Sequence, residues 1–149
     1  MTRNIIIVLA MSFLISSPLA AAGVDESSTS SSDPRYIEAK RAINSSRFDQ
    51  ALPLLQQVVV AFPDDPNTWN YLGYSLRKLG RFDRALAAYK KALAINPDHL
   101  GANEYIGELY IETKQMDLAR QHLKNLDRIC FFGCEAYDDL KEAIAKAGG

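Results

Sequence analysis

The chain has two cysteines, Cys130 and Cys134, which lie in the segment LDRICFFGCEAYDDL over residues 126–140. Two thiols at this spacing can form a disulfide, hold a soft metal ion such as Cu(I), or exchange with other thiols in a redox enzyme. A disulfide in so short a loop would add only about 2 kcal/mol in the loop-entropy model, so its main effect would be to fix the angle between the elements it joins. The choice depends on the compartment and on those elements.

The N-terminus predicts export from the cytoplasm. A positively charged start is followed by an apolar run over residues 5–15, and Ala20 and Ala22 occupy the positions that a signal peptidase reads. The run is shorter than the roughly 20 residues that span a bilayer. We therefore interpret residues 1–22 as a signal peptide, cleaved after Ala22, and expect the protein in the periplasm of a Gram-negative bacterium.

The rest of the sequence predicts a short linker and one small soluble domain. Residues 23–33, GVDESSTSSSD, are mostly Ser, Thr and acid, which is typical of a disordered linker. Overall, 48% of the residues are hydrophobic and 23% are charged. The formal net charge of −1 gives no reason to expect a nucleic acid or an anionic membrane as partner.

An oxidising compartment and an even number of cysteines favour a structural disulfide between Cys130 and Cys134. Cu(I) is the natural soft ion for two thiolates. A distant histidine could join such a site, but we interpret His99 and His122 as ordinary surface histidines. Zinc needs four ligands, or three and a water. A redox role stays open because Cys134 is predicted to begin a helix, where thiolates are stabilised.

Residues of one kind recur every 34 positions, as in repeat proteins. The recurring sets include Phe48, Phe82 and Met116; Ala51, Ala85 and Ala119; and Leu55, Tyr89 and Leu123. Within a unit, apolar residues stand three to four apart in two runs separated by a turn, which predicts two antiparallel helices. Gly73 and Ala85 would let the two helices of the middle unit approach closely, with Tyr89 beside them.

Residues 66–99 resemble a tetratricopeptide repeat at nearly every signature position, which here are Trp69, Leu72, Gly73, Ala85, Tyr89, Ala92 and Pro97. Residues 100–133 form a clear third unit in which Phe131 replaces the terminal proline, and residues 32–65 form a weaker first unit. The resemblance implies an all-α, right-handed α-solenoid of three antiparallel helix pairs over residues 34–149. Residues 135–147 are predicted to form a capping helix, because the last pair would otherwise expose its apolar face.

In that family the first helix of each unit lines a concave groove that binds peptides. Twelve positions of this chain correspond to the groove, and helical periodicity places nearly the same set off the packed face. They are Tyr36, Lys40, Ile43 and Asn44; Asn70, Tyr74, Arg77 and Lys78; and Glu104, Glu108, Ile111 and Glu112. The set is basic in the first two units and acidic in the third. It predicts a partner segment that is acidic and then basic along the groove, with Tyr74 and Arg77 as the strongest contacts.

Some family members grip a C-terminal carboxylate with Lys, Asn and Arg side chains from three repeats. Lys40 with Asn44, Asn70 and Arg77 are similar to such a clamp, but their spacing is shifted. Glu104 and Glu108 also stand where it would need cations. The sequence therefore argues against carboxylate recognition of this type.

No catalytic constellation is visible, because neither histidine stands beside a nucleophile and no glycine-rich phosphate loop follows a strand. We predict a non-enzymatic adaptor or assembly factor, without cofactor or metal and without membrane contact after signal cleavage, that binds a protein or peptide segment. Its oligomeric state is left open. The alternative is a thiol- or copper-handling protein that uses Cys130 and Cys134 while the repeats dock a client.

Overall fold

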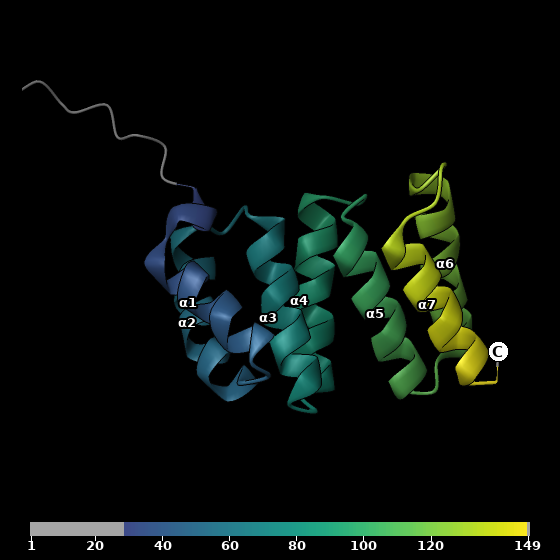
Figure 1. Ribbon diagram of the computed structural model, residues 1–149, viewed down its shortest axis with the longest axis horizontal. Coiled ribbons are helices and arrows are strands. Elements are labelled where there is room, and N and C mark those ends of the chain that lie inside the picture. The colour runs from purple at the N-terminus through teal and green to yellow at the C-terminus, as the bar shows by residue number, and fades with distance from the viewer. Residues whose placement is uncertain (1–28, 149) are drawn as a thin grey trace, which may run out of the picture.

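The computed structural model describes residues 29–148, so the predicted signal peptide and most of the predicted linker lie outside the described residues. Within this range the chain is all-helical, as predicted, with no strand (Figure 1). After a short 3₁₀ helix, η1 (Ser30–Ser32), the helices are α1 (Pro34–Asn44), α2 (Phe48–Ala61), α3 (Pro66–Lys78), α4 (Phe82–Ile95), α5 (Leu100–Glu112), α6 (Met116–Ile129) and α7 (Glu135–Lys146). None of the helices in residues 29–148 has the length and apolar character needed to cross a membrane.

The helices stack as three pairs, α1 with α2, α3 with α4, and α5 with α6 (Figure 1). The first helices α1, α3 and α5 contact one another along the stack, and α7 packs on both α5 and α6. The last helix thus takes the place that the first helix of a further pair would have. This is the solenoid with a C-terminal cap that the repeat pattern predicts.

The turn inside each pair holds one residue in the left-handed backbone region. These residues are Ser46 (φ 55°), Gly80 (φ 70°) and Lys114 (φ 60°), again 34 positions apart. A left-handed residue after a helix lets the chain reverse while the last carbonyls stay hydrogen-bonded. Of these three residues, only Gly80 is of a type that predicts the left-handed conformation from the sequence.

Two glycines let helices approach closely. A Cβ atom on Gly73 would lie 2.6 Å from ring carbons of Tyr89, which is fully buried, and one on Gly107 would lie 2.5 Å from a methyl carbon of Leu140 in α7. Glycine inside a helix costs about 1 kcal/mol relative to alanine. The close packing of Tyr89 and Leu140 offsets that cost and sets the spacing of the stack.

The described structure includes the last residues of the predicted linker. Ser30 is buried, and its hydroxyl donates a 2.7 Å hydrogen bond to the Asp65 carboxylate. Asp65 caps α3 by accepting hydrogen bonds from the backbone N–H groups of Asn67 and Thr68. Serine-rich composition argued against burial, but one hydroxyl that meets a capping carboxylate is enough to anchor the end of the predicted linker.

Candidate functional site: the face of the first helices

The first helices carry tyrosines along the face on which partner residues were predicted. The rings of Tyr36 and Tyr71 meet edge to face with centroids 5.8 Å apart, and those of Tyr74 and Tyr105 lie 4.8 Å apart. Phe48 meets Tyr74 at 5.6 Å. We call this surface the first-helix face and define it by Tyr36, Lys40, Tyr71, Tyr74, Lys78, Glu104, Tyr105 and Glu108. Its aromatic rings join α1 to α3 and α3 to α5.

Two exposed lysines lie over these rings. The Lys40 ammonium nitrogen lies 5.8 Å from the centre of the Tyr36 ring and 5.7 Å from that of Tyr71. The Lys78 nitrogen lies 5.3 Å from the centre of the Tyr74 ring. Neither lysine forms an ion pair with any residue in the range 29–148. The rings hold the two positive charges on the face, where an acidic group of a partner can reach them.

Arg77 has a different place from the one predicted. Its side chain is only 2% exposed, and its guanidinium donates a 2.7 Å hydrogen bond to the Glu112 carboxylate and also pairs with Glu108. The guanidinium carbon lies 5.6 Å from the centre of the Tyr74 ring and 5.8 Å from that of Tyr105. Arg77 therefore ties α3 to α5 and is not exposed to a partner, which corrects its assignment as a contact residue.

The other predicted groove residues divide between the surface and the interior. Lys40, Asn44, Lys78 and Glu112 are exposed, and Tyr74, Glu104, Glu108, Ile43 and Ile111 are half-buried. Tyr36 and Asn70 are buried, with 7% and 5% of their surface exposed. Tyr36 packs against Tyr71 across α1 and α3, and Asn70 faces α5, where the lack of a side chain on Gly101 makes room for its amide. Asn70 therefore belongs to the packing between repeats, and Tyr36 is the buried ring that supports Lys40 on the first-helix face.

The acidic end of the face includes residues of the cap that the groove prediction did not contain. Glu135 and Asp139 of α7 line, together with Glu104 and Tyr105 of α5, a pocket of about 320 Å³. Burial raises the pKa of Glu104 to about 8, and the nearby carboxylates of Glu108, Asp139 and Glu135 act in the same direction, against Arg77. Because Arg77 is engaged with Glu108 and Glu112, the acidic pocket is open to a cationic group from outside.

Two tyrosines of the face were missed by the groove prediction. Tyr71 and Tyr105 stand 34 residues apart and so occupy equivalent places in their repeats. That periodicity was available in the sequence. They were overlooked because the prediction followed the family's groove positions, which lie one residue earlier in each helix, at Asn70 and Glu104.

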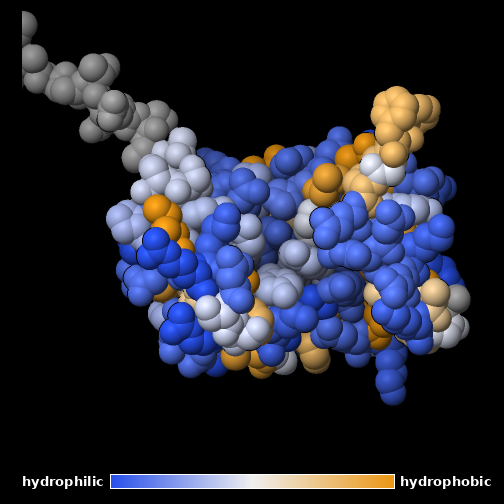
Figure 2. Space-filling model, viewed as in Figure 1, coloured by the Kyte–Doolittle hydropathy of each residue, from blue (hydrophilic) through white to orange (hydrophobic). Residues whose placement is uncertain are grey.

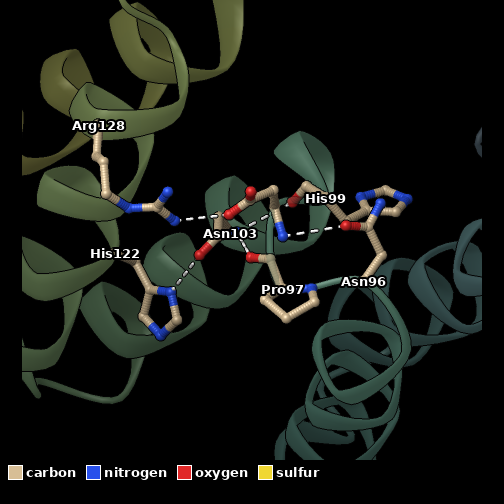
Figure 3. A network of polar contacts seen from close by, with 7 residues as sticks. Asn96, Pro97, His99, Asn103, His122 and Arg128 are labelled. Carbon is tan, nitrogen blue, oxygen red and sulfur yellow. Dashed lines mark hydrogen bonds and ion pairs between the residues drawn. The ribbon is translucent and has the colours of Figure 1, made fainter.

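Both histidines are built into the junction between the second and third pairs (Figure 3). His99 caps α5 by accepting a 3.1 Å hydrogen bond from the backbone N–H of Ala102. His122 is hydrogen-bonded to the side chain of Asn103 at 3.0 Å, and that amide also donates to the carbonyls of Pro97 and His99. Burial lowers the pKa of both histidines. They are structural groups, not the ordinary surface histidines that the sequence predicted.

Cys130 and Cys134 are joined in a disulfide in the structure. Cys130 directly follows α6, and Cys134 directly precedes α7. The bond thus spans the junction between the third pair and the cap. Across residues 29–148, no three His, Cys, Asp or Glu side chains are grouped so that they could hold a metal ion.

Two tetratricopeptide repeat models match the chain, one over residues 36–99 and the other over residues 76–144. Among curated proteins, tetratricopeptide repeat protein 37 of Xenopus laevis is 32% identical over 88 residues, which are 59% of this chain and 6% of that protein. The peroxisomal targeting signal receptor of Candida albicans is 32% identical over 79 residues, 53% of this chain and 13% of the receptor. The chain thus spans a small fraction of these relatives.

Solved structures show the same fold. MamA MSR-1 C2 is 28% identical, with a TM-score of 0.60 over 64% of this chain and 55% of that one. The TPR2B domain of yeast Sti1, in its pHsp70 complex, gives a TM-score of 0.70 over 76% of this chain and 93% of that one, at 19% identity. At that identity the likeness to Sti1 concerns the fold alone.

The raised pKa of Glu104 predicts a particular dependence of stability on pH. Between the ordinary value of 4.5 and the folded value of about 8, the folded state holds a proton that the unfolded state has lost. The contribution of Glu104 to the free energy of unfolding must therefore fall as the pH rises through this range. Because the carboxyl is only partly buried, we expect a loss on the order of 1–2 kcal/mol.

Urea unfolding of the wild type and of Glu104→Gln across this pH range measures the effect. The difference in the free energy of unfolding, variant minus wild type, should increase as the pH rises. Both proteins contain the same histidines, so the titration of the histidines cancels in this difference. Glu38→Gln on the exposed side of α1 is the matched control and should run parallel to the wild type. A Glu104→Gln curve that also runs parallel would contradict the assignment.

Proposed function

Since this chain belongs to the tetratricopeptide repeat family, we propose that it is a protein–protein interaction module, an adaptor or assembly factor, that binds a protein or peptide segment across the first-helix face. The observation that carries the proposal is the separation of unpaired charge on that face. Lys40 and Lys78 are exposed over tyrosine rings at one end. At the other end the acids Glu135 and Asp139 line a pocket beside Glu104, whose raised pKa keeps its own carboxyl largely protonated at neutral pH.

The tyrosines between these charges suit a binding surface. Tyr71, Tyr74 and Tyr105 are half-buried, so each offers part of its ring to a partner while its neighbours hold it in place. Rigid aromatic side chains of this kind give large contact area at a low cost in conformational entropy. The charges then select a segment that is acidic over α1 and α3 and basic over α5 and α7.

The relatives support a binding role at the level of the family. The Candida albicans relative is named as the receptor of a peroxisomal targeting signal, and the Sti1 domain was solved in a complex with pHsp70. No catalytic arrangement accompanies the face in residues 29–148, and the buried Arg77 is used to hold the repeats together. We therefore propose recognition without chemistry.

We also propose that the protein acts in the bacterial periplasm. The support is the signal-peptide pattern of residues 1–22 and the disulfide between Cys130 and Cys134, a bond that persists in oxidising compartments. Intact-mass measurement of the protein from the periplasmic fraction, without reductant, is the test. We expect a chain that starts at Gly23 and lacks two hydrogens. An uncleaved chain with two free thiols in the cytoplasmic fraction would contradict the proposal.

Reversing the two exposed lysine charges should weaken binding of a matching peptide. The probe is a fluorescent peptide with a run of aspartates followed by a run of lysines, measured by fluorescence anisotropy. Lys40→Glu/Lys78→Glu should lower its affinity about tenfold or more, because two attractive contacts become repulsive. Lys90→Glu/Lys91→Glu makes the same charge change on exposed residues of α4, in the other helix layer, and should leave the affinity unchanged.

Equal weakening by both double variants would show non-specific charge attraction and would contradict the assignment of the face. Absence of any binding by the wild type would contradict the charge pattern proposed for the partner. Circular dichroism of each variant establishes that the comparison is made between folded proteins.

A further inference from the structure

The loop between α6 and α7 carries an apolar projection that the rest of the described chain leaves uncovered. Phe131 is 84% exposed and Phe132 is 97% exposed, and their rings stand edge to face with centroids 5.1 Å apart. Figure 2 shows a hydrophobic projection at the position of this loop, standing clear of a largely hydrophilic surface. Single exposed apolar side chains are common, but two adjacent phenylalanines in this state mark an interaction site.

The loop holds these rings outward. The Cys130–Cys134 disulfide closes it, Gly133 turns the chain with φ 85°, and the Gly133 N–H donates a 2.7 Å hydrogen bond to the Cys130 carbonyl. Glycine is the residue that adopts this backbone region at no steric cost. A loop fixed before binding loses little conformational entropy when it docks. We call it the phenylalanine loop, residues 130–134.

The opposite end of the stack has a hollow that no helix in residues 29–148 covers. A cavity of about 790 Å³ lies between α1 and α2, with an apolar lining that includes Ile37, Pro53 and Leu54. Ile37 is 40% exposed. At the other end α7 covers the last pair, whereas no helix in residues 29–148 covers this hollow. The two ends of the solenoid are thus different in shape, one projecting and one hollowed.

The charges around the two features are complementary. Arg41 and Arg47 line the hollow, together with Glu38, and neither arginine forms an ion pair with another residue in the range 29–148. The phenylalanine loop leads directly into the first turn of α7, which carries the exposed acids Glu135 and Asp138. Docking the loop into the hollow would bring this acidic turn toward the arginines.

We propose that the phenylalanine loop of one copy docks into the α1–α2 hollow of a second copy, so that the protein associates head to tail. The loop and the hollow are different surfaces of one protein, so the contact is heterologous. Each assembly of copies therefore has an unoccupied hollow at one end and an undocked loop at the other. Two phenylalanine side chains bury roughly 300–500 Å². A stable interface buries about 1,200–2,000 Å² in total, so the association is weak and reversible.

A membrane is the competing occupant of the phenylalanine loop. Two exposed aromatic rings can enter the interfacial layer of a bilayer, but the acids at the start of α7 would be repelled by an anionic lipid surface. The hollow with its arginines supplies apolar surface and the opposite charge on the same chain. The observations therefore favour a second copy.

Sedimentation velocity over a range of protein concentrations tests the proposal. The wild type should show a weight-average mass that rises with concentration, and Phe131→Ser/Phe132→Ser should stay monomeric throughout. Leu54→Lys, which places a charge in the hollow, should stay monomeric as well. Val60→Ser removes another exposed apolar side chain, 81% exposed on α2, and as the matched control should associate like the wild type.

Mixing the two monomeric variants gives the most specific result. The phenylalanine variant keeps its hollow, and Leu54→Lys keeps its loop, so together they form one intact contact. An equimolar mixture should therefore produce a dimer that does not grow further, although neither variant associates alone. A symmetric contact between like patches could not produce this behaviour.

Other outcomes overturn the proposal. These are a wild type that stays monomeric up to millimolar concentration, association that survives both substitutions, or a mixture that remains monomeric. Flotation with vesicles of phosphatidylethanolamine and phosphatidylglycerol separates the membrane alternative. Binding of vesicles by a monomeric wild type, lost in Phe131→Ser/Phe132→Ser, would replace self-association with a membrane contact.

Discussion

The buried guanidinium of Arg77 is the interaction on which the candidate binding face depends. A charge taken out of water costs several kcal/mol unless its partners replace the lost hydration. Here the partners are the carboxylates of Glu108 and Glu112 and the faces of Tyr74 and Tyr105. Because these groups come from both α3 and α5, the second and third repeats must keep one relative orientation for the charge to stay paired.

This ion pair also decides which charges a partner meets. It engages Glu108 and Glu112 with Arg77, so the acidic groups left for a partner are Glu135 and Asp139 at the pocket beside α7. The positive character rests with Lys40 and Lys78, which are supported by tyrosine rings. The cap, held to the third pair by the disulfide, therefore takes part in the face as well as closing the stack.

The interval of 34 residues was enough to predict the fold, because each helix pair is a local unit and the pairs stack in sequence. The arrangement of the site was less accessible. The pairing of Arg77 with Glu112 joins residues 35 positions apart and depends on how the pairs rotate against each other, which periodicity alone does not define. The burial of Ser30 and the role of His99 as a helix cap depend in the same way on single contacts across a junction. The exposure of Phe131 and Phe132 follows from a closed loop, whereas their residue type alone would have predicted burial.

A double-mutant cycle between Arg77 and its two carboxylate partners tests the central claim most directly. The free energy of unfolding would be measured by urea denaturation for the wild type, Arg77→Met, Glu108→Gln/Glu112→Gln and the combination. We predict a coupling free energy of about 1–3 kcal/mol, with the combined variant more stable than the sum of the separate losses implies. A coupling that is zero within error would mean that Arg77 does not hold the second and third repeats together, and the account of a preformed face would be wrong.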